Sequence, residues 1–344
     1  VQNRAIYVEA SRGCPFACEF CLSSLDKKVR TFPLQRFFAD MQNLIDRGVR
    51  HFRFIDRTFN LNIRTSTEIL QFFLGRIDQG LFVHFEMIPD RLPTDLRELI
   101  RQFPDGALQF EIGIQTFDTD TSGRISRRQD LDKLEDNFRF LRAETGVHVH
   151  ADLIIGLPGE TMESFADGFD RLLDLGPQEI QVGILKRLRG TPISRHSEEH
   201  GIVYSPAPPY EILQSVVLPF DELQRLKRFA RAWDLVGNSG NFRESKELLW
   251  TGSSPFWSFL GFSDWLFENI GQFKGIALTR LCTLLSNYLI QVREQTPALV
   301  YSTMARDYGR TGRRLPGFLA EHAEVSAPVS APRGTPRRQA KHLA

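Results

Sequence analysis

The chain has 344 residues, of which 42% are hydrophobic and 25% charged, and its formal net charge is +1. This composition is typical of a folded globular protein, and it excludes a wholly disordered, collagen-like or disulfide-stapled chain. No stretch reaches the roughly 18 consecutive apolar residues of a membrane span, and the near-neutral charge gives no reason to expect a polyanionic partner.

In chain order, strand patterns alternate with helix patterns over the first part of the sequence. The strand patterns cover residues 4–9, 51–56, 81–87, 107–114, 148–155 and 179–185. The helix patterns between them cover residues 34–46, 65–75, 94–103, 131–144 and 161–175. Such alternation predicts parallel strands joined by right-handed crossovers. Six strands are fewer than the eight of a closed barrel, so the sequence favours an α/β fold that is either a partial barrel or an open doubly wound sheet.

A proline-dense segment at residues 205–210 marks the end of this alternation. Beyond it, residues 220–235, 242–249 and 276–292 have helical patterns, and all four tryptophans lie in this region, where we expect them to form its core. The predicted organisation is therefore a β/α domain over residues 1–204, a helical domain over 205–325, and a disordered basic tail over 326–344. The sequence lacks an initiator methionine, as expected for a fragment of a longer chain.

Three of the four cysteines lie close together. Cys14, Cys18 and Cys21 are spaced C-x3-C-x2-C, whereas Cys282 lies in an apolar helical pattern and is expected in the core. An odd cluster of thiols argues against disulfides and for a metal site in a reducing compartment, so we predict a cytoplasmic protein. On a cubane iron–sulfur cluster, three thiolates leave one iron open to another ligand. Zinc with a distant fourth ligand is the alternative.

The strand patterns carry polar residues on one face, because side chains alternate sides along a strand. These polar positions are His84 and Glu86, then Gln109, Glu111, Gly113 and Gln115, then His148, His150 and Asp152. Buried polar groups need partners, so this face lines either a ligand-filled cavity, which we favour, or a self-paired polar network. Ligands bind at the carboxyl ends of parallel strands. We therefore expect one mouth that gathers the cysteines, Asp56, Asn60, Pro89, Asp90, Gln115, Thr116, residues 156–160, Lys186, Arg187 and Arg189.

Residues 14–21, with the sequence Cys-Pro-Phe-Ala-Cys-Glu-Phe-Cys, resemble the cluster loop of radical S-adenosylmethionine (SAM) enzymes. The resemblance extends over roughly residues 4–195 and implies a partial (β/α)6 barrel. It also implies that Cys14, Cys18 and Cys21 hold a 4Fe-4S cluster whose open iron is chelated by SAM, with Phe20 near the adenine.

Finer matches resemble the branch that contains oxygen-independent coproporphyrinogen dehydrogenase. They cover residues 85–86, 113–115, 125–129 and 152–160. This similarity implies that Glu86 and Arg127 hold the amino acid end of SAM, and that Gln115 and Asp152 hold its ribose hydroxyls. The chemistry agrees, since carboxylates accept hydrogen bonds from an ammonium or a diol and a guanidinium pairs with a carboxylate.

The family's glycine-rich segment after the second strand is absent, and residues 54–60 (Phe-Ile-Asp-Arg-Thr-Phe-Asn) stand there instead. This phrase, residues 7–14 and the helical C-terminal region resemble the branch that often carries an N-terminal cobalamin-binding domain and a helical C-terminal domain of unknown function. The Asp-x-His-x-x-Gly signature of the cobalamin domain does not occur in this chain. Either a preceding domain has been removed, or this member works without it.

The resemblance implies an enzyme that cleaves SAM reductively to a 5′-deoxyadenosyl radical, with an external one-electron donor. Its substrate is a small molecule or unknown, and cobalamin-dependent methyl transfer is the outcome that the resemblance suggests. The alternative is a non-catalytic zinc or iron–sulfur electron-transfer protein. An RNA-modifying enzyme of the methylthio-transfer type is disfavoured, because no second cysteine cluster or RNA-binding module stands out. We therefore expect neither a membrane nor a nucleic acid as partner.

Overall fold

The computed structural model describes residues 4–250, 252–322 and 335–343. They form two compact units. Unit 1 contains the described residues up to Pro219 together with Thr335 and Pro336, and unit 2 contains those from Phe220 on, including the final segment from Arg337. Each unit has its own core, and each is described by itself below.

Unit 1 is built on one six-stranded parallel sheet. Its strands, in spatial order, are β1 (Ala5–Val8), β4 (His51–Phe54), β5 (Phe82–Met87), β6 (Leu108–Gln115), β7 (His148–Ile155) and β8 (Glu179–Ile184). Every neighbouring pair runs parallel, and spatial order follows chain order. The α/β fold predicted from the alternation is confirmed as a partial barrel of six strands.

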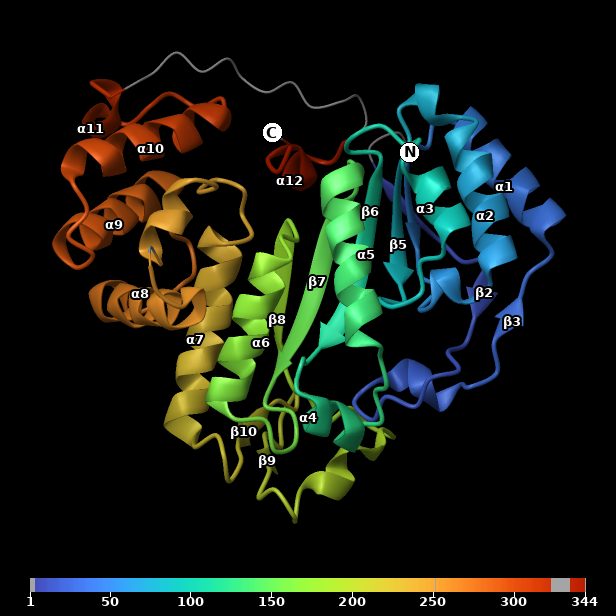
Figure 1. Ribbon diagram of the computed structural model, residues 1–344, viewed down its shortest axis with the longest axis horizontal. Helices are drawn as coiled ribbons and strands as arrows, with labels where there is room; N and C mark the ends of the chain where they lie inside the picture. The colour runs from blue at the N-terminus through green and yellow to red at the C-terminus, as the bar shows by residue number, and fades with distance from the viewer. Residues whose placement is uncertain (1–3, 251, 323–334, 344) are drawn as a thin grey trace. The chain divides into compact units, whose positions relative to one another are not determined.

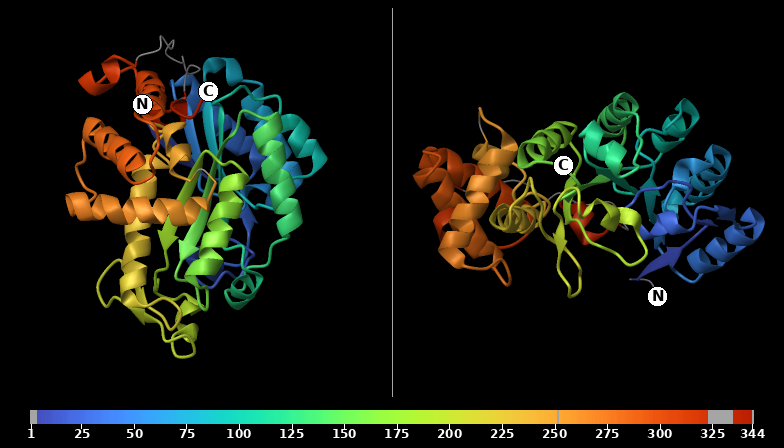
Figure 2. Two further views of the ribbon diagram at one scale, coloured as in Figure 1. Left: turned by 60° about the vertical axis from the view of Figure 1, so that its left-hand side comes forward. Right: turned by 90° about the horizontal axis from the view of Figure 1, so that it is seen from below.

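Helices lie along one side of this sheet, as Figure 1 and the view from below in Figure 2 show. They are α1 (Leu34–Asp46), α2 (Ile63–Leu74), α3 (Thr94–Ile100), α4 (Thr119–Arg124), α5 (Leu131–Glu144) and α6 (Met162–Asp174). The helix patterns read from the sequence match five of these within a few residues, and α4 was not predicted. Short 3-10 turns also occur at η1 (Leu22–Leu25), η2 (Phe59–Leu61), η3 (Ile77–Gln79) and η4 (Pro192–His196).

The apolar strand face packs under the helices because phenylalanines fill the interface. Phe54 lies 5.8 Å from Phe37 of α1 and 5.9 Å from Phe73 of α2, and Phe85 lies 4.5 Å from Phe54 between ring centroids. All of these rings are buried. Burying each such side chain contributes on the order of 2 kcal/mol, so this face fixes the strand register and turns the polar positions to the other side.

The register aligns the polar positions in rows across the sheet. One row contains Arg53, His84, Gln109 and His148. The next row, nearer the carboxyl ends, contains Glu86, Glu111, His150 and Glu179, and the last contains Gly113, Asp152 and Gln181. The predicted polar face therefore exists as a set of aligned rows.

Two small antiparallel pairs complete unit 1. β2 (Ser11–Arg12) pairs with β3 (Arg30–Thr31), which closes the segment that carries the three cysteines. β9 (Val203–Tyr204) pairs with β10 (Ile212–Gln214), and Ile212 N–H donates to Leu185 O at 2.9 Å. The proline-dense segment thus folds back on the chain that follows β8. The compact units accordingly divide after Pro219, whereas the sequence suggests a boundary after residue 204.

Unit 2 is helical, as expected. Its elements are α7 (Phe220–Val236), η5 (Ser245–Leu249), α8 (Pro255–Ile270), α9 (Leu278–Gln291), α10 (Pro297–Arg310), α11 (Gly317–Ala320) and α12 (Arg337–Ala340). Trp233 is buried in its core beside Phe229 and Phe259, but Trp257 is 42% exposed, so the expectation that all four tryptophans form core is wrong. Among the described residues, no helix combines the length and apolarity needed to cross a membrane.

The predicted disordered tail, 326–344, lies partly outside the described residues, which resume at Thr335 and end at Leu343. Within that final segment, Arg337–Ala340 forms the short helix α12, where the sequence predicts no order. Arg338 pairs with Asp234 of α7 at 3.0 Å, and Lys341 Nζ donates to Asn241 Oδ1 at 3.0 Å.

Candidate functional site

A cavity of about 300 Å³ opens at the carboxyl ends of the strands in unit 1. Every residue that the sequence selects for cofactor or metal binding lines it: Cys14, Cys18, Cys21, Phe20, Glu86, Gln115, Arg127 and Asp152. Its wall also includes Arg57, Asp90, Glu111, Gly113, Arg128 and Gln129. The cysteine loop and the polar strand face therefore share one cavity, as expected from the topology.

Other residues expected at this mouth do not line the cavity. Asp56 is buried and accepts hydrogen bonds from Ala10 N–H at 3.0 Å and from the Ser11 hydroxyl at 2.7 Å. Asn60 is buried too, and its amide bonds the backbone of Ile88 and Arg91 in the loop after β5. These two side chains hold neighbouring loops in place, so their role in the described structure is support.

The remaining expectations about the mouth are corrected in the same way. Thr116 donates from its hydroxyl to Glu160, and this buried pair lies outside the cavity wall. Lys186 forms an isolated bridge with Glu211, and the Arg187 guanidinium lies 5.6 Å from the Tyr204 ring. Neither these two cations nor Arg189 lines the cavity.

The three clustered cysteines are free thiols. Cys14 and Cys18 are buried and Cys21 is half-buried. Burial raises the pKa of the Cys14 thiol. The Arg127 guanidinium lies beside them, with Nη1 3.4 Å from Cys18 Sγ, and its other nitrogens donate to the Ile114 carbonyl at 3.1 Å and to the Gly113 carbonyl. Arg127 thus ties the cysteine loop to the end of β6.

Gln115 has a left-handed backbone, with φ of 75°, at the irregular end of β6. Its side-chain nitrogen would lie only 2.4 Å from a Cβ added at Gly113, so the absence of a side chain at Gly113 makes room for the Gln115 amide at the cavity wall.

Two carboxylates of the cavity have contrasting environments. Glu111 has a pKa lowered to about 2, chiefly because the His84 imidazole lies 3.2 Å from its Oε2, with Arg53 at 3.0 Å. Burial raises the pKa of Asp152 well above its usual value, and the nearby Glu111 and Glu86 carboxylates raise it further. Asp152 Oδ1 is buried without a hydrogen-bond partner among the described residues, with His150 Nε2 at 3.5 Å. Asp152 therefore retains the capacity to bind a ligand hydroxyl.

Glu86 is paired with a residue to which the sequence reasoning gave no role. Arg57 Nη1 donates to both Glu86 oxygens, at 2.8 and 3.0 Å. Burial raises the pKa of Glu86, although Arg57 opposes this shift. The available signal was positional, since Arg57 follows the second strand at its carboxyl end, as do the other site residues.

A second group missed from the sequence anchors the cysteine loop. Glu19, between two of the cysteines, is 2% exposed. Its carboxylate accepts hydrogen bonds from the Ser126 hydroxyl at 2.7 Å, from His196 Nε2 at 2.9 Å and from Arg195. Its backbone bonds Ile125 and Ile193, both at 3.1 Å. We call this set of contacts the Glu19 latch.

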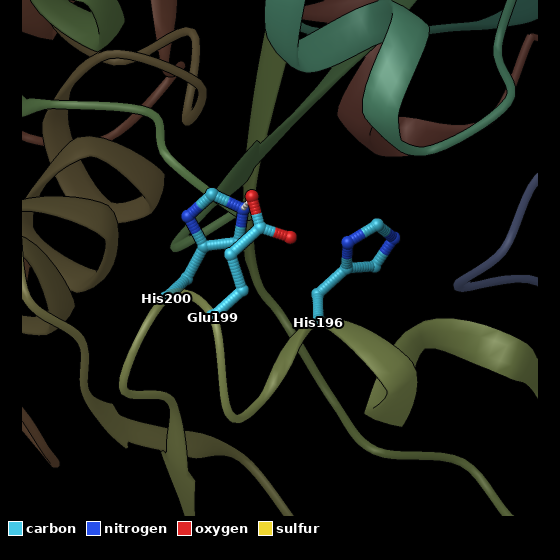
Figure 3. A group of neighbouring side chains, drawn as sticks. All are labelled: His196, Glu199 and His200. Carbon is cyan, nitrogen blue, oxygen red and sulfur yellow. Dashed lines mark ion pairs between the residues drawn. The ribbon is translucent and has the colours of Figure 1, made fainter.

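His196 also belongs to a histidine–glutamate group next to the latch. Figure 3 shows Glu199 between His196 and His200, and one ligand atom from each residue lies within 4.8 Å of the others. That spacing is compatible with a metal ion. However, His196 Nε2 is bonded to Glu19, the Arg195 guanidinium lies 3.4 Å from the same nitrogen, and Glu199 is 76% exposed. The neighbouring cation opposes a divalent ion here, so we assign His196 to the latch.

Comparison with known proteins agrees with this geometry. Residues 8–172 match the Radical SAM superfamily, and residues 198–328 match a protein family of unknown function, DUF4080. The second match confirms the resemblance to a branch with a C-terminal domain of unknown function.

The chain is also similar to curated enzymes. It is 24% identical over 204 residues to tRNA-2-methylthio-N(6)-dimethylallyladenosine synthase of Acinetobacter baumannii (strain AYE), covering 56% of this chain and 42% of that protein. It is 25% identical over 170 residues to ribosomal protein uS12 methylthiotransferase RimO of Porphyromonas gingivalis (strain ATCC BAA-308 / W83), covering 47% of this chain and 39% of that protein. The chain thus spans less than half the length of these relatives.

Among solved structures, the radical S-adenosylmethionine methyltransferase TsrM of Kitasatospora setae, with tryptophan and a SAM analogue bound, superposes with a TM-score of 0.52. The sequence identity is 16%, and the match covers 64% of this chain and 46% of TsrM. This likeness shows the fold. Independently of it, residues 8–172 match the Radical SAM superfamily and so form a radical SAM domain.

Proposed function

We propose that this protein is a radical SAM enzyme in which Cys14, Cys18 and Cys21 hold a 4Fe-4S cluster beside a SAM-binding cavity. The observation that carries the proposal is that three thiols and five further predicted site residues, from distant parts of the sequence, line the same cavity. Such a cluster, reduced by an external one-electron donor, supplies the electron that cleaves SAM to methionine and a 5′-deoxyadenosyl radical.

The residues present fit this cofactor pair. Three thiols supply the soft ligands that an iron–sulfur cluster needs, and no fourth cysteine and no histidine lines the cavity among the described residues. A closed tetrahedral zinc site would need another ligand. The buried, unpartnered oxygen of Asp152 suits a sugar hydroxyl as its donor. The non-catalytic alternative is therefore the weaker proposal.

Each side chain then has a defined task. Glu86 accepts hydrogen bonds from the SAM ammonium, and Asp152 and Gln115 bind the ribose hydroxyls. Phe20 packs near the adenine. Arg127, to which the resemblance assigns the SAM carboxylate, contacts Cys18 and two backbone carbonyls in the structure.

The outcome that we favour is methyl transfer, with cobalamin as a candidate further cofactor. The support is indirect. TsrM is described as a methyltransferase, and a second TsrM structure, with a TM-score of 0.50, contains cobalamin and a 4Fe-4S cluster. The curated relatives are named for methylthio transfer to tRNA and to a ribosomal protein. We propose a small-molecule substrate in a cytoplasmic enzyme.

The test is anaerobic reconstitution of the purified chain with iron and sulfide. The expected result is cluster absorbance and reductant-dependent formation of 5′-deoxyadenosine from SAM. Serine in place of any one of the three clustered cysteines should abolish both signals. Cys282→Ser is the matched control, because Cys282 is buried in the core of unit 2 and is not one of the residues that line the cavity. Stoichiometric zinc, or a cluster whose spectrum ignores SAM, would instead support the non-catalytic alternative.

A further inference from the structure

Among the residues that the structure describes, the arginines that line the cavity are Arg57, Arg127 and Arg128. A guanidinium is the side chain best suited to a carboxylate, because it donates two parallel hydrogen bonds. SAM has one carboxylate, on its amino acid end. The existing contacts of each arginine indicate which of them can hold that group.

Arg127 already uses all three of its guanidinium nitrogens. Nε donates to the Ile114 carbonyl at 3.1 Å, Nη2 donates to the Gly113 carbonyl, and Nη1 faces Cys18 Sγ at 3.4 Å. Turning this side chain toward a ligand would break its hydrogen bonds to two carbonyls at the end of β6, of which the Ile114 carbonyl also accepts from Gln129 Nε2 at 3.2 Å. Lost hydrogen bonds of partly buried groups cost free energy. Arg127 is therefore a poor partner for the SAM carboxylate.

Arg57 is differently placed. Only Nη1 is used, by the two Glu86 oxygens, and its Nε and Nη2 have no partner among the described residues. Its side chain is 54% exposed, against 18% for Glu86. Burial opposes its charge, but the Glu86 carboxylate raises the pKa of Arg57. Arg57 lines the same cavity as Cys21 of the cysteine loop.

The pair of Arg57 and Glu86 is complementary to a zwitterionic α-amino acid. The Arg57 guanidinium can bind the ligand's carboxylate while the neighbouring Glu86 carboxylate binds the ligand's ammonium. We propose that Arg57, rather than Arg127, holds the SAM carboxylate while Glu86 holds its ammonium. This inference rests on the proposed function and deepens it. It gives a binding role to the segment that replaces the family's glycine-rich motif.

The test compares SAM with decarboxylated SAM, which keeps the ammonium, sulfonium and adenosine but lacks the carboxylate. Dissociation constants are measured by equilibrium dialysis with the anaerobically reconstituted protein. The quantity of interest is the ratio of the two constants, because the two ligands differ only in the carboxylate. In Arg57→Gln this preference for SAM should fall about ten-fold or more, as expected for a lost charged hydrogen bond. Arg57→Lys should retain part of it.

The other two cavity arginines are the comparison variants. Arg128 lines the cavity but, unlike Arg57, forms no ion pair with Glu86 in the described structure, so Arg128→Gln should leave the ratio unchanged. Iron content and circular dichroism confirm that each variant is folded and loaded. If Arg57→Gln weakens both ligands equally, Arg57 only supports Glu86, and the inference is wrong. A collapse of the ratio in the Arg127 or Arg128 variant but not in Arg57→Gln would also overturn it. If the loaded wild-type protein binds no SAM, the proposed function itself fails.

Discussion

Replacing Glu19 should loosen the cysteine loop without removing any thiol. The Glu19 latch joins this loop to the segment after α4 through Ser126 and to the η4 turn through Arg195 and His196. In Glu19→Ala the backbone bonds of residue 19 remain, but the three side-chain donors lose their acceptor. The cysteine loop would then keep the backbone hydrogen bonds of residue 19 and lose its main side-chain support.

The expected size follows from the three hydrogen bonds. A hydrogen bond to a charged group contributes about 1.5–3 kcal/mol, but the Arg195 side chain is 61% exposed and can return to water, so its share is small. We expect Glu19→Ala to lower the free energy of unfolding by about 3 kcal/mol. Glu19→Gln keeps the shape and one acceptor oxygen, and its cost should be roughly half as large.

The assay is urea unfolding of the apo protein under reducing, anaerobic conditions, followed by measurement of iron content after reconstitution. Both should fall in Glu19→Ala. Glu199→Gln is the matched control beside the Glu19 latch, because Glu199 lies near His196 but is 76% exposed, and it should change stability by less than about 0.5 kcal/mol. Equal unfolding midpoints for Glu19→Ala and the control would refute the reasoning.

Three further changes test other parts of the structure. Burial raises the pKa of Glu160 from 4.5 to about 8, so between these pH values the folded protein keeps a proton that the unfolded chain loses. The free energy of unfolding should therefore fall as the pH rises from 4.5 to about 8, by up to about 1.4 kcal/mol per pH unit. Glu160→Gln should flatten this slope in denaturant titrations at pH 6 and 8. Phe85→Ala removes a buried ring that stacks on Phe59 at 3.8 Å and should cost about 3–5 kcal/mol of unfolding free energy, whereas alanine at an exposed phenylalanine should cost little. Asp307→Ala removes a buried carboxylate that accepts a hydrogen bond from the Ser245 hydroxyl at 2.6 Å, and it should lower the melting temperature of unit 2. Tryptophan fluorescence reports on this unit, since all four tryptophans lie in it, and an unchanged melting curve would contradict a structural role for Asp307.

The sheet and the place of the site were predictable for simple physical reasons. Strands such as β6 and β7 alternate polar and apolar residues with period two, so their faces can be assigned without knowing what they pack against. Consecutive parallel strands end on the same edge, so residues that follow them converge. These two rules are enough to bring Glu86, Gln115 and Asp152 to the cysteines.

The partners of individual polar side chains could not be predicted in this way. Asp56 and Asn60 follow β4 as Arg57 does, yet they bond neighbouring backbone, while Arg57 reaches the cavity. Whether a polar group faces a ligand or a loop depends on rotamers and on chain segments distant in sequence. The same limit applies to Glu19, whose partners lie more than a hundred residues away along the chain.

The helical unit was harder to predict because its signals are less periodic. The sequence pattern gave no helix for α8, which is apolar on most sides, or for α10, whose first residue is Pro297. A proline at the first position of a helix is favourable, because its missing N–H would have had no partner there. The proline-dense segment before α7 likewise reads as a linker, yet residues within it pair with the chain after β8.

The aligned rows of polar side chains explain how a cavity can coexist with a folded polar interior. His84 and Arg53 pair with Glu111, and His148 pairs with Glu179 at 3.1 Å. These contacts form a paired network, one of the two alternatives for this face. Glu86 and Asp152 differ from these pairs. Glu86 is paired with an exposed arginine from a loop, and Asp152 has an unpartnered oxygen. The network of paired side chains supports the fold because it leaves no buried charge of Glu111 or Glu179 without a partner. Glu86 and Asp152 are the carboxylates that a cationic, hydroxyl-bearing ligand such as SAM would stabilise.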